Sequence, residues 1–88
     1  MTAEQKELAR HALGLPNKAK KSYRNRYVCE ESEPNWSEMV SQGLATTRAA
    51  STLPFGGDAC FYLTLAGAMA ALNKGEKLCT EDFPEARS

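Results

Sequence analysis

The 88-residue sequence predicts a small α+β domain with three short helices and a β-hairpin. Two capping-box patterns, Thr2 with Gln5 and Asn35 with Glu38, mark helix starts, because each side chain satisfies a backbone group that the first turn leaves unpaired. The run Cys60–Leu63 is rich in residues that favour strands. A chain of this length forms one hydrophobic core, so we expect a single domain.

The first helix is predicted over Ala3–Leu13, after Thr2 as its cap. Gly14 is expected to end it in the left-handed conformation, and Pro16 cannot continue it. The side facing the core should consist of its apolar residues, namely Leu8, Ala12 and Leu15, with His11 or Ala9 alongside.

A basic segment follows this helix. Residues 17–28 hold five basic side chains and no acidic one: Lys18, Lys20, Lys21, Arg24 and Arg26. The weak alternation over Tyr23–Cys29 predicts an extended segment or a short edge strand. Four glutamates then occur between residues 30 and 38. Residues 1–29 carry seven basic and two acidic side chains, a net charge of +5, and residues 30–88 carry four and nine, a net charge of −5.

A second helix is predicted from Asn35 through Gln42, with one apolar stripe formed by Trp36, Met39 and Val40. Gly43 is expected to end this helix, with Leu44 packing back against it in the Schellman arrangement.

A hairpin is predicted next, because strand-like residues 45–49 and 60–63 flank a loop, Ser51–Asp58, that contains one proline and two glycines. Thr64 should cap a third helix over Leu65–Asn73, with its large apolar residues facing the core: Leu65, Met69 and Leu72. We assign residues 1–77 to the domain and residues 78–88 to an acidic, partly flexible tail in which Phe83 is an anchor.

Part of this pattern is similar to the winged-helix family. The segments that carry the likeness lie between residues 36 and 72: Met39-Val40, Gly43-Leu44-Ala45, and Phe61-Tyr62-Leu63-Thr64 followed by Gly67. The resemblance implies the end of a recognition helix, a wing and a closing strand. Only about twenty residues separate the first helix from Trp36, so the helix that enters the DNA major groove in that family is missing or shortened here. The expected fold is therefore a truncated winged-helix-like domain.

The chain also resembles small uncharacterised proteins of phage and prophage genomes. The residues that carry this likeness are His11–Leu15, Ser22–Val28, Gly56-Gly57-Asp58, Leu63-Thr64 and Glu81–Pro84. The resemblance implies an accessory role in the cytoplasm of a bacterial host cell and brings no catalytic residues. The absence of an apolar N-terminal run, and of any stretch long enough to span a bilayer, is consistent with a cytoplasmic protein that does not bind membranes.

No enzymatic activity, cofactor or metal site is expected. His11 is the single histidine, and on a helix beside the core it is more often structural than catalytic. The three cysteines, Cys29, Cys60 and Cys79, lack the close pairing of a structural zinc site, and we expect reduced thiols, with Cys60 a small core residue.

Two functions remain open. The favoured one is binding of a host or phage protein, or of a second copy, through the apolar tip Leu53, Pro54 and Phe55 together with the basic segment. The alternative is nucleic-acid binding, in which Lys18, Lys20, Lys21, Arg24 and Arg26 contact phosphates while Tyr23 stacks on a base. The neutral total charge and a tip without lysine or arginine favour the protein partner. If the glutamates after residue 29 pair with the basic side chains, the nucleic-acid alternative loses its site.

Overall fold

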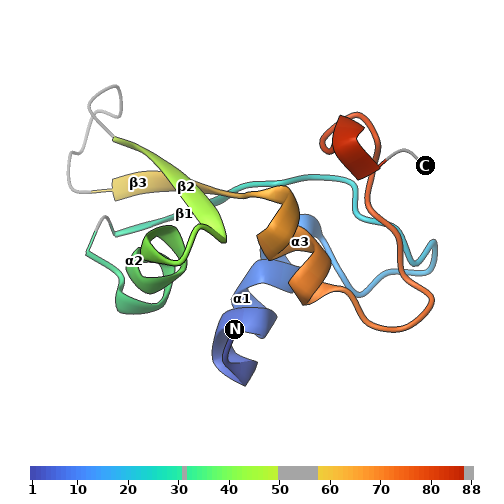
Figure 1. The fold of residues 1–88 in the computed structure, drawn as a ribbon, viewed down its shortest axis with the longest axis horizontal. Helices are drawn as coiled ribbons and strands as arrows, with labels where there is room; N and C mark the ends of the chain where they lie inside the picture. Colours follow the sequence, from blue (N-terminus) through green and yellow to red (C-terminus); the bar gives the residue numbers. More distant parts are fainter. Residues whose placement is uncertain (31, 50–57, 87–88) are drawn as a thin grey trace.

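The computed structural model describes residues 1–30, 32–49 and 58–86. Over these residues the chain forms three α-helices and a three-stranded antiparallel sheet, so the predicted α+β class is confirmed. In chain order the elements are α1 (Ala3–Leu13), β1 (Tyr27–Glu30), α2 (Pro34–Ser41), β2 (Ala45–Ala49), β3 (Asp58–Leu63), α3 (Leu65–Ala71) and the 3-10 helix η1 (Pro84–Ala86). Figure 1 shows the three helices on one side of the sheet.

Helix α1 begins and ends where its sequence predicts. The Thr2 hydroxyl accepts a hydrogen bond from the Gln5 amide, and the Gln5 side chain accepts one from the Thr2 amide, both at 3.1 Å. At the other end Gly14 adopts φ = 81°, which a residue without Cβ reaches at little cost. The buried residues are Gln5, Ala9, Ala12 and Leu13, whereas His11 is exposed, so of the two residues placed beside the inward face only Ala9 is there.

The strand order is β1-β3-β2, and both pairings are antiparallel. The predicted hairpin is β2 with β3, in which Ala45 lies opposite Leu63. The basic segment forms a strand only from Tyr27, which lies opposite Phe61, and residues 23–26 are extended without strand pairing.

The prediction that Asn35 caps the second helix is wrong. Glu33 is the cap: its carboxylate accepts a hydrogen bond from the Trp36 amide at 2.8 Å. Pro34 therefore falls in the first turn, where a residue without an N–H leaves no donor unpaired. The end of α2 is as predicted, because the Leu44 amide donates to the Met39 carbonyl and the Gly43 amide to that of Val40, the two bonds of a Schellman motif.

The prediction for the third helix is only partly right. The helix ends at Ala71, two residues before the predicted Asn73. Leu65 and Leu72 are half-buried and pack against the core as expected, but Met69 is 56% exposed, and the buried residues of α3 are Gly67, Ala68 and Ala71. The physical reason is a close backbone approach, since a Cβ placed on Gly67 would lie 1.9 Å from the Leu44 carbonyl oxygen. The small residues therefore face the body of the protein, and the large side chain of Met69 has no room there.

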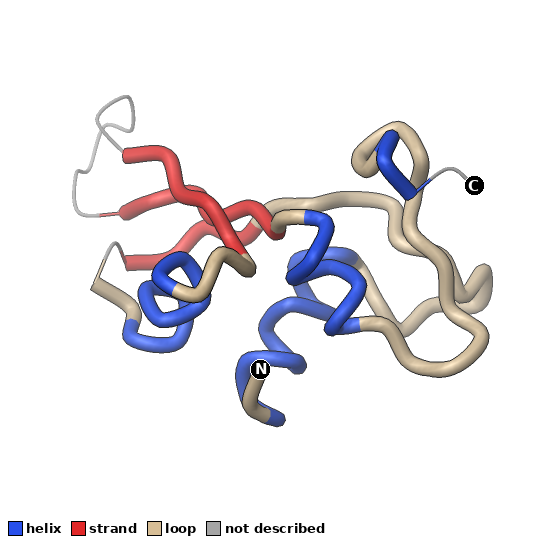
Figure 2. The backbone as a smooth tube through the Cα atoms, in the orientation of Figure 1, coloured by secondary structure: helices blue, strands red, loops and turns tan. Residues whose placement is uncertain are grey.

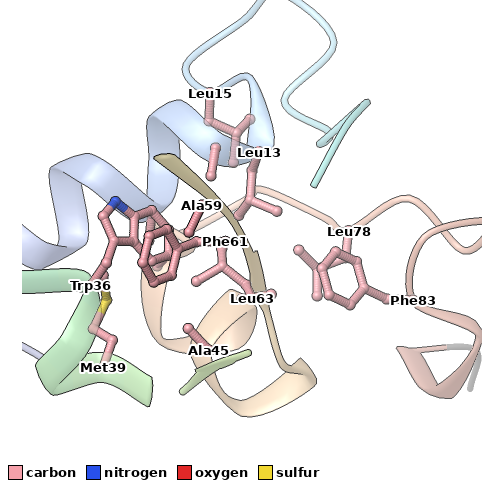
Figure 3. Close-up of a cluster of buried hydrophobic side chains, with 14 residues drawn as sticks. Leu13, Leu15, Trp36, Met39, Ala45, Ala59, Phe61, Leu63, Leu78 and Phe83 are labelled. Carbon is pink, nitrogen blue, oxygen red and sulfur yellow. The ribbon is translucent and has the colours of Figure 1, made fainter. Parts of the chain in front are cut away.

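The core lies between the sheet and the helices. Figure 3 shows Trp36 and Phe61 stacked, and their ring centroids are 5.3 Å apart. Tyr27, the cross-strand partner of Phe61, also packs against Trp36, with ring centroids 5.4 Å apart and ring planes tilted by 34°. The remaining fully or nearly fully buried apolar residues are Ala9, Ala12, Leu13, Leu15, Met39, Ala45, Ala59, Leu63, Ala68, Ala71, Leu78 and Phe83.

The segment after α3 returns to the N-terminal part of the chain. Figure 2 shows its loops beside the loop that follows α1, at the end of the molecule away from the strands. Arg10 forms an ion pair with Glu76, and Leu78 and Phe83 are buried. Glu76 also accepts a hydrogen bond from the Asn73 amide at 2.6 Å. The Arg10 guanidinium lowers the pKa of Glu76 from 4.5 to about 2.

No helix in the described part of the chain has both the length and the apolar character that crossing a membrane requires.

Candidate nucleic-acid interface

The side chains of Lys18, Lys20, Lys21, Tyr23, Arg24 and Arg26 form what we call the basic strip. Its second half is held by the last turn of α1, whose carbonyl groups have no partner within the helix. The Tyr23 amide donates to the Leu13 carbonyl and the Arg26 amide to the Ala12 carbonyl, both at 3.2 Å. The Arg24 guanidinium donates to the His11 carbonyl at 2.7 Å. The charge of Arg24 is thus partly used to stabilise the C-terminal end of α1.

Asn25, between the two arginines, ties the backbone of the strip to the end of β3. Its side-chain amide donates to the Leu63 carbonyl at 3.1 Å and accepts from the Leu63 amide at 2.9 Å. The Asn25 side chain therefore makes the two hydrogen bonds that a backbone partner on a neighbouring strand would make to Leu63, at the end of β3. Arg26, the next residue, directly precedes β1.

The lysine half of the strip is a loop held by Asn17 and by the C-terminal segment. The Asn17 side chain donates to the Gly14 and Lys21 carbonyls at 3.1 and 2.8 Å. The Lys77 amide donates to the Lys20 carbonyl at 2.9 Å, and the Ser22 amide donates to the Lys77 carbonyl at 3.0 Å. This pairing brings a further lysine to the strip, and no local sequence pattern could have indicated it.

Two of the four glutamates that follow the strip have hydrogen-bond partners outside it. Glu33 caps α2, and Glu38 accepts a hydrogen bond from Gln42. Over residues 1–30, 32–49 and 58–86 the structure has one ion pair, between Arg10 and Glu76, and it involves no residue of the strip. The acidic residue Glu81 lies near the strip, because it lines an open hollow of about 370 Å³ together with Lys21 and Tyr23. Glu81 and Lys21 do not form an ion pair.

The two tyrosines of the basic segment have different surroundings. Tyr23 is 64% exposed, its ring lies against Gly14, and the Arg24 guanidinium carbon is 5.4 Å from the ring centroid. Tyr27 is half-buried and packs between Trp36 and the edge of His11, whose ring centroid is 5.5 Å away. Tyr23 is therefore the tyrosine of this segment that can meet a ligand.

A second group of side chains lies on the sheet face that the helices leave uncovered. The Arg48 guanidinium carbon is 5.8 Å from the ring centroid of Tyr62, and the charge of Arg26 also acts on the Tyr62 hydroxyl. A hydrogen bond with Cys60 raises the pKa of Tyr62 above its usual value of 10. The prediction that Cys60 is a core residue is wrong, because it alternates with the buried Ala59 and Phe61 and lies half-buried on this outer face.

Sequence reasoning missed Arg48 and Tyr62 because it treated the hairpin as a wing with a functional tip. The available signal was the pleat, since the residues between the buried ones of β3 must point away from the core.

His11 lies at the surface beside the strip. With Arg24, Arg26, Tyr27 and Val28 it lines an open hollow of about 310 Å³. Within the described ranges no three of the metal-ligating residue types His, Cys, Asp and Glu come together.

The predicted protein-binding residues Leu53, Pro54 and Phe55 lie outside the described residues. Comparison with models of protein families, with curated proteins and with solved structures gave no match. The likeness to phage proteins and to winged-helix domains therefore stays a prediction.

Proposed function

We propose that this protein binds nucleic acid through the basic strip. The observation that carries the proposal is that most cationic side chains of the strip are exposed and form no ion pair with any described residue. Lys18, Lys20, Lys21 and Arg26 are exposed, and their side chains have no acidic partner among the residues that the structure describes. Cations on a fixed backbone that form no ion pair with carboxylates are suited to phosphate groups.

The fold adds to this argument through the placement of the strip. The α1 carbonyls hold one half, and Lys77 holds the other half. A preorganised series of cations loses less conformational entropy on binding than the same residues on a disordered arm. Affinity should then come mainly from the release of counterions from the phosphates, and it should fall steeply with salt.

The experiment is a fluorescence anisotropy titration of labelled DNA and RNA at several salt concentrations between about 50 and 200 mM. With about five phosphate contacts, the slope of log K against log salt should be about −3.5 to −4.5. The double variant Lys20→Ala/Lys21→Ala should reduce the magnitude of the slope by about 1.4 to 1.8. Lys6→Ala removes a positive charge from α1, outside the strip, and should leave the slope unchanged.

No binding at the lowest salt, or a slope near zero, would contradict the proposal. A host or phage protein, or a second copy of this chain, would then be the partner to test. Affinity capture with the Leu53→Ala/Phe55→Ala variant is the matching experiment for that function.

A further inference from the structure

The uncovered face of the sheet combines an aromatic ring with two arginines. Tyr62 belongs to the central strand β3, Arg48 to the edge strand β2, and Arg26 precedes the other edge strand, β1. Arg48 lies opposite Cys60, one row from Tyr62 on the same face, and Tyr27 pairs with Phe61, so Arg26 lies beside Tyr62 on the other side. We call Arg26, Arg48 and Tyr62 the Tyr62 face.

Positive and negative charges are unevenly distributed over this face. Neither guanidinium has an ion pair within the described ranges, and Arg48 is held only against the Tyr62 ring. The acid on the same face of β1 is Glu30, which lies two rows from Arg26, at the opposite end of the strand. The face is therefore cationic around the aromatic ring and acidic at its far end.

We propose that the Tyr62 face binds the bases of a single-stranded nucleic acid, with Tyr62 as the stacking residue and Arg26 and Arg48 on the flanking phosphates. This inference rests on the proposed function and names its substrate class. Arg26 is also part of the basic strip, so the two surfaces are continuous, and one strand can run from the lysines onto the sheet. In the complex Arg48 would leave the Tyr62 ring to the base and contact a phosphate beside it.

A single strand fits this face better than a duplex does. The bases of a duplex are stacked on one another and present only their edges in the grooves, so a ring on an open sheet cannot reach their faces. An unpaired base exposes both faces of its ring, and stacking on an aromatic side chain is open to every base. A neutral protein surface would leave both arginines without a partner, which is costly in a buried contact.

The test uses the full chain with a labelled oligothymidine of about 12 nucleotides and a duplex of equal length. Wild type should bind the single strand more tightly than the duplex. Tyr62→Ala should weaken binding to the single strand about 5- to 150-fold without changing the salt slope, because stacking releases no counterions. Tyr62→Phe keeps the ring and should bind as wild type does. Arg48→Ala should lower the magnitude of the slope by about 0.7.

Met69→Ala is the control, because it also truncates a large side chain at the surface, but on α3 and not on the sheet face. Tight binding of the single strand by both Tyr62→Ala and Arg48→Ala, or a preference of wild type for the duplex, would overturn the inference. The basic strip would keep its function in either case if the lysine variant still changes the salt slope. Loss of all binding by wild type would instead overturn the proposed function.

Discussion

The two faces of the sheet use the same strands for opposite purposes. Phe61 and Tyr62 are neighbours in β3, yet Phe61 is 2% exposed and stacks on Trp36, whereas Tyr62 lies beside two arginines on the outer face. The arginines also differ, since Arg10 on α1 is paired with Glu76, whereas Arg48 on the outer face has only an aromatic neighbour. The buried core residue and the residue of the proposed binding face are thus neighbours in the pleat, and each can be mutated without the other.

The largest expected effect separates the two aromatic neighbours. Phe61→Ala removes a ring from the stack with Trp36 and should lower the free energy of unfolding by about 3 to 5 kcal/mol. Tyr62→Ala leaves the core intact and should cost less than about 1 kcal/mol. Urea unfolding followed by the fluorescence of Trp36, the single tryptophan, measures both. Similar losses in the two variants would show that the faces are not energetically distinct.

The second prediction concerns the paired arginine. Glu76→Gln keeps the shape of the side chain but removes the charge that faces Arg10, and should cost about 1 to 3 kcal/mol at pH 7. Because the pKa of Glu76 is lowered from 4.5 to about 2 in the folded state, its contribution is complete above about pH 4.5 and is lost as the pH falls toward 2.

Urea unfolding at pH 7, 4 and 2.5 should therefore show wild type and Glu76→Gln converging as the pH falls. Glu85→Gln, at an exposed position in η1, is the control and should follow wild type throughout. A constant difference between wild type and Glu76→Gln over this range would mean that the charge of Glu76 does not stabilise the fold.

The smallest expected effect on stability is at the outer arginine. Arg48→Ala should change the free energy of unfolding by no more than about 0.5 kcal/mol, because an exposed side chain with one aromatic contact contributes little. Differential scanning calorimetry should find the melting temperature within a few degrees of wild type. A loss as large as that of Glu76→Gln would place Arg48 among the residues that hold the fold.

Local chemistry was sufficient to predict both ends of α1, the C-terminal end of α2, the start of α3 and the hairpin. The hydroxyls of Thr2 and Thr64 and the glycines at 14 and 43 act within a few residues of themselves, so their roles can be derived from sequence alone. The prediction of the α2 cap failed because Glu33 and Asn35 both have a side chain that can accept a hydrogen bond from the first turn. Pro34 favours the first helical position, which makes the preceding residue, Glu33, the cap.

Contacts between distant segments could not be predicted. Met69 was expected to face the core, but the Leu44 carbonyl, 23 residues earlier in the chain, lies against Gly67 and leaves Met69 at the surface. The same holds for the candidate site: its cations could be counted from the sequence, but their freedom from acidic partners depends on where Glu33 and Glu38 are used. Lys77 joins the strip through a backbone pairing across more than fifty residues.

That pairing also means that the lysine loop can reach its final conformation only after the C-terminal segment has been synthesised. The lysine loop is held by Lys77, and Ser22 accepts a hydrogen bond from the Cys79 amide at 2.8 Å, while Phe83 seals the core behind them. At about 5 to 20 residues per second, a ribosome needs several seconds to add these later residues after the lysines have been made. A nascent chain therefore carries the charges well before it can hold them in register, and only the finished segment gives them a shared geometry.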